Sequence, residues 1–264
     1  MSSAEQAAAV LKKMQPEDWM VLHGLEKALD AYEVVPLGYL IKVTGLYRDE
    51  VEYRLGRLNE AKFIVGSPKG FTLVTAGLDA LALNAFVRKG LVSAMGRAIG
   101  VGKEADVFEV VSDLGDVLAV KLYRIGRISF RATKRKRSYA PPLSQHSWLV
   151  VSIQAAKREF EALKKLQPLD ASVPEAIARE RHAILMKKIE GRILPEWPEL
   201  PDPSRVLREI LTTLRTAYTK AQIVNSDLSE YNILFDGTKP WIIDWPQAVS
   251  TLHPNASILL DRDV

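Results

Sequence analysis

The stretch VNSDLSEYNILFDGTKPWIIDWPQ, residues 224–247, decides more about this 264-residue chain than any other part of it. Two short apolar runs, residues 233–235 and 241–243, lie on either side of Asp236-Gly237. An Asp-Gly pair between two apolar runs is typical of a tight turn that joins antiparallel strands. The stretch therefore predicts a loop, a strand, a turn and a returning strand.

Three polar residues lie where that hairpin opens, namely Asp227, Asn232 and Asp244. Phosphoryl transfer needs an acid that orients the nucleophile, and an amide with a second acid that hold magnesium. The alternative interpretation is a set of solvated turn residues. We favour an ATP-using phosphotransferase, because the segments that come before this stretch follow the order used in kinases.

The first of those segments is a glycine-rich loop, Gly100-Val101-Gly102-Lys103-Glu104, between two predicted strands. A Walker loop is excluded, because Glu104 follows Lys103 where a Ser or Thr should bind magnesium. We predict that the loop covers the phosphates of ATP. An ordinary turn between strands remains the alternative, since such turns often contain two glycines.

A lysine and a glutamate predict an ion pair in the same region. Lys121 lies at the end of a predicted strand, and Glu159 shares the apolar face of a predicted helix over residues 152–166 with Ala156 and Leu163. An inward carboxylate needs a partner, and Lys121 is the natural one. Such a pair directs the lysine ammonium group at the α- and β-phosphates.

The segment after the predicted strand over residues 183–186 is a candidate for adenine binding. Met186 would flank the purine, and the carbonyl of Lys187 and the amide of Ile189 would bond to its edge. An ordinary junction between a strand and a loop explains the local sequence equally well.

Residues 1–90 predict a winged-helix domain, because three helices precede a hairpin and a further helix follows it. Thr75 is the predicted N-cap of that last helix. The predicted helices span residues 16–31, 36–43, 47–60 and 75–89, and the hairpin pairs residues 63–65 with 71–74.

The third of these helices mixes both signs of charge, with Arg48, Arg54 and Arg57 among several acidic residues. Phosphate binding requires a positive surface. The sequence therefore favours a module that docks on RNA or protein over a sequence-specific DNA reader. Lys62 and Lys69 on the wing are the best phosphate contacts if nucleic acid binds.

From residue 91 the pattern changes to short strands followed by helices and loops, which predicts a two-lobed domain. Strands are predicted over residues 98–100, 107–111 and 117–122, and a helix over residues 202–220. The fold class is α+β, with an N-lobe of about residues 91–186 and a C-lobe of about residues 191–264.

Composition excludes several classes of protein. The chain is 47% apolar, which allows more than one core, and it has no cysteine for disulfides or thiolate zinc sites. No segment approaches the ~20 apolar residues of a membrane span, and the N-terminus lacks the apolar core of a signal peptide. We expect a cytoplasmic protein that does not contact a membrane.

The positive charge behind the net charge of +4 is concentrated in one part of the chain. Residues 1–90 hold 11 basic and 11 acidic residues, whereas residues 117–158 hold ten basic residues and no acidic one. This run is either a solvated charged segment or a contact to RNA phosphates or a protein partner, and the sequence does not decide between them.

Five segments carry a resemblance to a known family: GVGKEADVFEV (100–110), LAVKLYRIGRISFR (118–131), SWLVVSIQAAKREFEALKKL (147–166), NSDLSEYNIL (225–234) and IIDWPQAVSTLHPNA (242–256). By these segments the chain resembles the RIO family of atypical serine/threonine protein kinases, in its second, winged-helix-bearing branch. The DWPQ motif, where ordinary kinases have DFG, and the STLHPNA tail are the specific features.

The resemblance implies roles for the residues singled out above. Asp227 would be the catalytic acid/base, and Asn232 with Asp244 would hold Mg²⁺, or Mn²⁺ in its place. Lys121 with Glu159 would position the phosphates of ATP. The acceptor stays open among a Ser/Thr hydroxyl, water and Asp244 itself.

The resemblance also implies partners. We expect a monomeric kinase/ATPase with autophosphorylation, acting on the pre-ribosomal small subunit through rRNA and ribosomal or assembly proteins. Lys103 and Glu104 would lie near the γ-phosphate, and residues 126–145 match the flexible loop of the family. A nucleotide-switched RNA-binding assembly factor with little phosphotransfer is the alternative.

Three departures from the family pattern stand out. Asn225-Ser226 replaces the usual His-Gly before the catalytic Asp, Ala105 replaces a common serine, and the chain stops at Val264 where relatives usually continue through a basic helix. The first departure puts the packing around Asp227 in doubt.

Overall fold

The structure is a computed structural model that describes residues 1–125 and 145–264. It separates into two compact units. The first consists of Met1–Asp116, Lys121–Ile153 and Glu180–Ala183, and the second of Val117–Val120, Gln154–Arg179 and Ile184–Val264. The basic residues expected in a flexible loop, 126–144, lie outside the described part of the chain.

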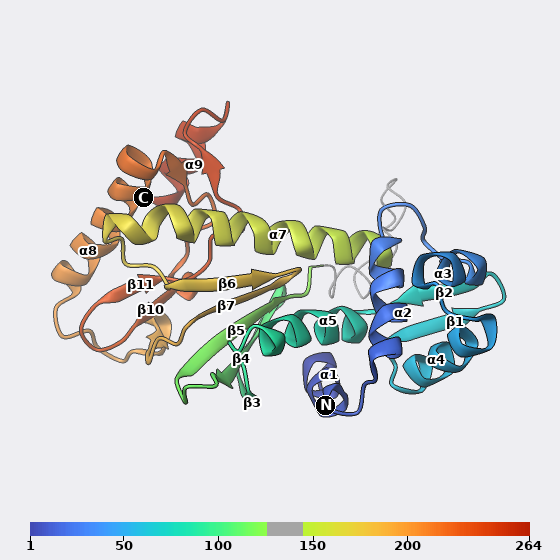
Figure 1. Cartoon of the computed structure of the whole chain (residues 1–264). Coiled ribbons are helices and arrows are strands. Elements are labelled where there is room, and N and C mark those ends of the chain that lie inside the picture. Colours follow the sequence, from blue (N-terminus) through green and yellow to red (C-terminus); the bar gives the residue numbers. More distant parts are fainter. Residues whose placement is uncertain (126–144) are drawn as a thin grey trace. The chain divides into compact units, whose positions relative to one another are not determined.

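The first unit opens with a winged helix, drawn in blue and cyan in Figure 1. Its elements are α1 (Ser3–Leu11), α2 (Pro16–Lys27), α3 (Leu37–Thr44), α4 (Arg48–Glu60), β1 (Ile64–Ser67), β2 (Gly70–Leu73) and α5 (Thr75–Arg88). The hairpin of β1 and β2 packs against α4 and α2, and α1 packs along α5. One core of aliphatic residues, including Leu22, Leu55 and Leu81, fills the space between the helices.

The predicted helices and hairpin of this domain are confirmed, with three differences. The helix predicted over residues 16–31 ends at Lys27. The helix α1 was not predicted, although Ser2 and Glu5 form a reciprocal capping box at its start. The predicted N-cap Thr75 is wrong, because Val74 is the N-cap residue of α5 and makes no side-chain bond. Thr75 is instead the first helical residue.

The first unit continues into a sheet. The strands β3 (Ala94–Val101) and β4 (Ala105–Val111) pair antiparallel, and β5 (Val117–Tyr123) follows a turn in which Gly115 has φ +88°. A positive φ favours glycine at this position. The strand order of the complete sheet is β3-β4-β5-β7-β6.

The second unit contains most of the remaining elements. They are β6 (Ala176–Glu180), β7 (Ala183–Lys187), β8 (Arg192–Ile193), α8 (Pro203–Thr216), β9 (Ile223–Val224), β10 (Ile233–Phe235), β11 (Pro240–Ile242), β12 (Val249–Ser250) and α9 (Ala256–Asp263), together with the larger part of α7 (Gln145–Leu166). The predicted helix over residues 202–220 ends its α-helical part at Thr216, and a π-helical turn, Ala217–Ala221, continues it. The strand β6 was not predicted.

A small sheet positions the polar residues of the second unit. Its strand order is β11-β10-β8, and α8 packs against β11. The side chains of Phe235 and Trp245 are fully buried beneath it. This packing fixes the ends of β10 and β11, where Asn232 and Asp244 lie.

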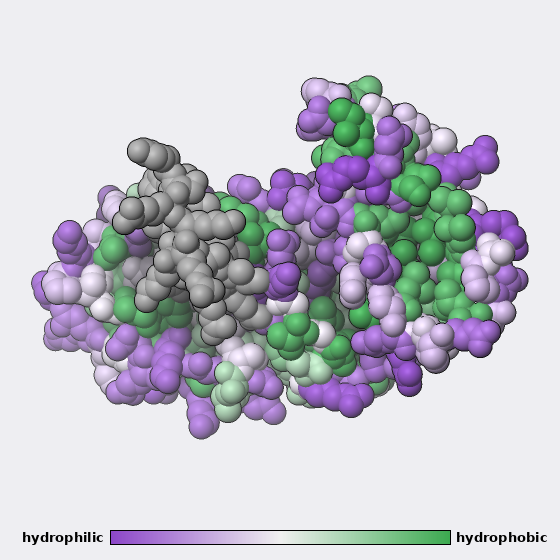
Figure 2. Space-filling model, turned by 180° about the vertical axis from the view of Figure 1, so that it is seen from behind, coloured by the Kyte–Doolittle hydropathy of each residue, from purple (hydrophilic) through white to green (hydrophobic). Residues whose placement is uncertain are grey.

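Burial of apolar side chains is incomplete, as in most proteins. Leu114 and Leu252 are each 90% exposed, and Figure 2 shows hydrophobic residues in green among the hydrophilic surface residues in purple. Among the described residues, no helix is both long enough and apolar enough to cross a membrane.

Candidate active site

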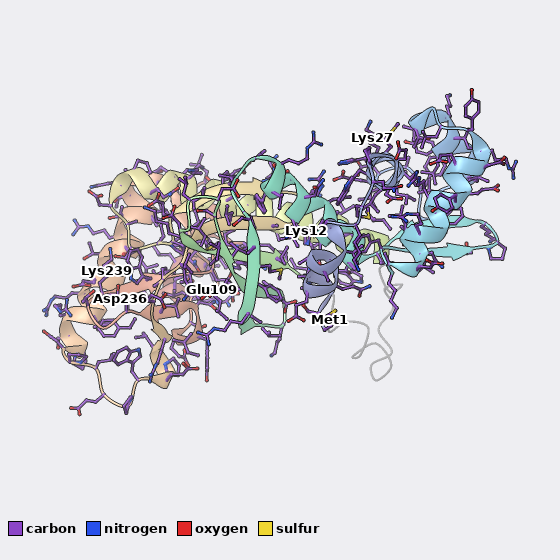
Figure 3. All side chains as sticks on the ribbon, turned by 60° about the horizontal axis from the view of Figure 1, so that its bottom comes forward. Met1, Lys12, Lys27, Glu109, Asp236 and Lys239 are labelled. Carbon is purple, nitrogen blue, oxygen red and sulfur yellow. The ribbon has the colours of Figure 1, made fainter. Side chains whose placement is uncertain are left out.

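The turn between β10 and β11 is held by one carboxylate. Asp236 accepts hydrogen bonds from the backbone amides of Thr238 and Lys239, each at 2.8 Å, and from the indole of Trp241 at 2.7 Å. Burial raises the pKa of Asp236, but these hydrogen bonds outweigh burial and lower the pKa well below its usual value. Figure 3 labels Asp236 and Lys239 on this turn. The hairpin is therefore a rigid support.

The open end of the hairpin brings Asn232 beside Asp244. The amide of Ile243 donates to the carbonyl of Asn232 at 2.9 Å, one step beyond the pairing of Ile233 with Ile242. Asp244 is the next residue along the returning strand. The predicted placement of these two residues at the mouth of a hairpin is thus present in the structure.

The side chain of Asn232 is oriented by the loop that precedes it. Its Nδ2 group donates to the carbonyl of Asp227 at 3.0 Å, which leaves Oδ1 as the acceptor atom of the amide. An amide oxygen and a carboxylate are hard ligands of the kind that Mg²⁺ binds. Asn232 and Asp244 therefore fit this ion, and phosphate oxygens would complete its coordination.

Within the described residues, no group of three or more His, Asp or Glu side chains could hold a metal ion by itself. A pair of ligands agrees with a Mg²⁺ ion that arrives with a nucleotide, because this ion usually takes one or two carboxylates plus substrate phosphates.

Asn225 bridges the two acidic residues of the site, and sequence reasoning did not find this. It is 1% exposed. Its Nδ2 donates to the carbonyl of Asp244 at 2.7 Å, and its Oδ1 accepts the amide of Asp227 at 3.1 Å. Both halves of one buried side chain thus fix the backbone that carries Asp227 and the backbone that carries Asp244.

Ser226 occupies a conformation that glycine adopts freely, with φ +66°. Its hydroxyl donates to the carbonyl of Gln247 at 2.5 Å. The departure from the family's His-Gly pair is therefore accommodated, because Asn225 and Ser226 both bond directly to the segment around Asp244.

Asp263 holds the same loop from the other side. It lies at the end of α9, is 8% exposed, and accepts the amides of Ser226 at 2.6 Å and Leu228 at 3.2 Å. These two amides flank Asp227. Burial raises the pKa of the Asp263 carboxyl, the two amides act against it, and the charge of Asp227 adds to the rise. Only the folded chain brings α9 to this loop.

Glu159 on α7 is fully buried, as its place on the apolar face predicted. Its Oε1 accepts the amide of Trp245 at 3.2 Å, the residue directly after Asp244. The Trp245 indole donates to the carbonyl of Ile242 at 3.0 Å. Glu159 thus anchors the segment that carries the proposed metal ligand.

The glycine-rich loop and Lys121 belong to the first unit. The loop is closed by a bond from the amide of Gly102 to the carbonyl of Ala105 at 2.8 Å, and Lys103 and Glu104 at its tip are exposed. Lys121 lies within β5 and is 8% exposed. Because Glu159 belongs to the second unit, the predicted Lys121–Glu159 pair stays a prediction.

The predicted adenine-binding segment runs past the end of β7. Met186 is buried, and the amide of Lys187 donates to the carbonyl of Glu175 at 2.9 Å. A pocket of about 790 Å³ is lined by Lys187, Ile189 and residues of the β10–β11 turn. Asp227, Asn232 and Asp244 do not line it, so we do not assign phosphate chemistry to this pocket.

An α+β fold with a hairpin that presents an acid, an amide and a second acid defines a kinase-type phosphotransferase. Comparisons with known proteins agree with this class. Residues 106–264 match the family model described as the RIO domain, and residues 11–89 match the model described as Rio2, N-terminal.

Individual relatives extend the match over nearly the whole chain. The RIO-type serine/threonine-protein kinase Rio2 of Methanocaldococcus jannaschii is 40% identical over 239 residues, which are 88% of this chain and 88% of that protein. The serine/threonine-protein kinase rio2 of Schizosaccharomyces pombe is 34% identical over 260 residues, 96% of this chain and 75% of that protein.

A solved structure agrees as well. The crystal structure of the Rio2 kinase–ADP/Mg²⁺–phosphoaspartate complex from Chaetomium thermophilum superposes with a TM-score of 0.85 at 33% identity, covering 97% of this chain and 80% of that chain. The chain therefore belongs to the Rio2 family of RIO-type serine/threonine-protein kinases. The predicted family, fold class and enzyme class are confirmed.

Proposed function

We propose that this chain binds Mg-ATP and transfers its γ-phosphoryl group at the Asp227, Asn232 and Asp244 site, in the maturation of the small ribosomal subunit. The observation that carries the proposal is the bridge through Asn225, which ties Asp227 and Asp244 to one buried side chain. A preorganised pair of this kind is what electrostatic stabilisation of a transferring phosphoryl group requires.

The proposal assigns a role to each residue of the site. Asp227 is exposed at the loop surface and orients the nucleophile as the acid/base group. Asn232 and Asp244 hold the Mg²⁺ ion, which neutralises charge on the phosphates when bound. Lys121 and Glu159 position the α- and β-phosphates, and residues 100–104 cover them.

For the acceptor, a relative offers support. The Chaetomium thermophilum structure is described as a complex with ADP, Mg²⁺ and phosphoaspartate. In this chain, we assign the corresponding acceptor in ATP turnover to Asp244. One carboxylate oxygen forms the new bond to the γ-phosphorus as the bond to the ADP oxygen breaks, and ADP leaves with that electron pair. Water then attacks the acyl phosphate, which releases inorganic phosphate and restores the carboxylate.

The winged helix contributes docking rather than reading of a DNA sequence in this proposal. The arginines of α4 are occupied by acids, since Arg54 lies 2.6 Å from Glu50 and Arg57 lies 3.0 Å from Asp18. A helix whose arginines are paired in this way has little positive charge left for phosphates. The docking partner would be rRNA or a protein of the pre-ribosomal particle, in the cytoplasm.

The test is acid-quenched labelling with [γ-³²P]ATP, run beside release of inorganic phosphate, for the wild type and Asp244→Asn. We expect Mg²⁺-dependent release, and a protein-bound label that hydroxylamine removes, because hydroxylamine cleaves acyl phosphates and leaves phosphoserine and phosphothreonine intact. Both signals should disappear in Asp244→Asn. A hydroxylamine-resistant label in the wild type would move the acceptor to a Ser/Thr hydroxyl.

The same experiment separates the second candidate function. Tight ATP binding without phosphate release, also in the presence of small-subunit precursor RNA, would favour a nucleotide-switched RNA-binding factor. The basic run over residues 117–158 is the observation that favours this second candidate.

A further inference from the structure

A buried cluster of titratable side chains connects α5, the last helix of the winged helix, to the glycine-rich loop over residues 100–105. Its four members, which we call the Arg124 cluster, are Asp79 on α5, Asp106 on β4, Arg124 directly after β5 and His182 in the turn between β6 and β7. All four belong to the first unit, and none is more than 5% exposed. Buried charges are stabilised only when they are paired and hydrogen-bonded.

The guanidinium of Arg124 is held in a single orientation by two carboxylates. Its Nη1 and Nη2 groups donate to the two oxygens of Asp79 at 2.7 and 2.9 Å, and its Nε group donates to Oδ2 of Asp106 at 3.2 Å. A planar fork bound in this way fixes both the position and the angle of the side chain.

The backbone of Arg124 contacts the loop directly. Its amide donates to the carbonyl of Glu104 at the tip of the loop, at 2.5 Å. Asp106, which binds the guanidinium, is the second residue of β4 and directly follows Ala105. Arg124 therefore bonds to the loop at two points. Its backbone amide binds Glu104 at the tip, and its guanidinium binds Asp106 at the base.

Asp79 connects α5 to Arg124 and therefore to the loop. It is fully buried, and its Oδ1 also lies 2.7 Å from Nε2 of His182. Burial raises the pKa of Asp79, but the charge of Arg124 and the hydrogen bond with His182 together outweigh burial and lower the pKa below its usual value. The amide of Tyr123 donates to the carbonyl of His182 at 3.0 Å, which ties the same turn to β5.

We propose that Asp79 and Arg124 are positioning residues for the glycine-rich loop, so that α5 of the winged helix sets the loop conformation that accepts nucleotide phosphates. This inference rests on the proposed role of that loop in binding ATP. A partner that moves α5 on docking changes nucleotide affinity, and by linkage nucleotide binding changes the affinity for that partner.

The chain offers a matched control in the same region. Arg181, in the same turn as His182, binds Glu26 on α2 through Nε–Oε1 at 2.5 Å and Nη2–Oε2 at 3.0 Å. This pair also joins a winged-helix element to the β6–β7 turn, and neither of its residues is a member of the Arg124 cluster. Glu26→Gln therefore removes a comparable ion pair and leaves the Arg124 cluster unchanged.

The test compares full-length wild type, Asp79→Asn and Glu26→Gln by two readouts. Amide hydrogen exchange of residues 100–106 in the nucleotide-free protein reports loop position directly. Calorimetric titration with ADP and Mg²⁺ reports its consequence. We expect Asp79→Asn to speed exchange in the loop and to raise the Kd for ADP roughly fivefold to twentyfold, which lies within the range of mutational effects on coupled networks. Glu26→Gln should leave both unchanged.

A second variant guards against a folding defect in Asp79→Asn. Asp106→Asn keeps the buried Asp79–Arg124 pair and weakens the contact between Asp106 and Arg124 at the base of the loop, so the same changes should appear with smaller size. Wild-type exchange in the loops of both variants would overturn the inference. A wild type that does not bind ADP with Mg²⁺ would instead contradict the proposed function. Hydrogen exchange of residues 100–106 would in that case still test whether Asp79 and Arg124 position the loop.

Discussion

The sharpest mutational test concerns the Asn225 bridge. Replacing Asn225 with Ala removes the bond from Nδ2 to the carbonyl of Asp244 and the bond from the amide of Asp227 to Oδ1. A buried polar group without its partner costs about 1–3 kcal/mol. Asp227 is exposed and its amide can bind water, so the loss of this bond should cost an amount at the low end of that range. In total, we expect Asn225→Ala to lower the free energy of unfolding by about 2–4 kcal/mol.

Two quantities then follow for Asn225→Ala. At about 2–4 °C for each kcal/mol in a protein of this size, the midpoint of thermal unfolding should fall by about 4–16 °C. Because Asp227 and Asp244 lose their common support, the rate of phosphate release should fall about 100-fold, as small misplacements of catalytic groups can cost. The midpoint is measured by thermal unfolding followed by circular dichroism, and the rate is measured at a temperature below the unfolding transition.

Thr213 supplies the control for stability alone. It is 3% exposed, accepts the amide of Ser172 at 3.3 Å and donates to the carbonyl of Glu209 at 3.1 Å, away from the site. Thr213→Val should lower the unfolding midpoint comparably and leave the rate unchanged. Asn225→His should release phosphate faster than Asn225→Ala, because a ring N–H of histidine can replace Nδ2 as the donor to the carbonyl of Asp244. A folded Asn225→Ala with the wild-type rate would refute the reasoning.

Two further predictions concern stability. Gly77→Ala should destabilise the chain by roughly 1–3 kcal/mol in urea unfolding, because the added Cβ would lie 2.3 Å from the carbonyl of Phe63, whereas Gly56→Ala, with nothing within 4 Å, should stabilise by about 1 kcal/mol. Burial lowers the pKa of His182 below 6.5, against the opposing effect of Asp79. Since the unfolded chain then binds more protons, the free energy of unfolding should fall as pH drops below 6.5, and His182→Gln should lack this loss.

Local patterns were enough to predict most elements. The apolar spacing within α2 and α4 and the Asp236-Gly237 pair mark the structures that form there, because each depends on residues close in sequence. The helix α1 could also have been found, since Ser2 and Glu5 have capping-box spacing. The strand β6 could not, because it is short and its edge position leaves it half-buried.

The sequence predicts the candidate site residues but not the side chains that support them. Asp227, Asn232 and Asp244 are recognisable from spacing alone, because a single hairpin arranges them. The bonds made by Asn225 and Asp263 depend on where β9 and α9 finish, which no local pattern encodes. The burial of Glu159 was predicted from helix periodicity, yet its bond to Trp245 was not.

The central claim is that Asp227 acts in transfer of the γ-phosphoryl group and not in binding of the nucleotide. The most direct measurement is single-turnover phosphate release from Mg-ATP by Asp227→Ala, run beside calorimetric titration of ADP with Mg²⁺. The account predicts that transfer is abolished while nucleotide affinity stays close to that of the wild type. Near-normal turnover in Asp227→Ala would contradict the account.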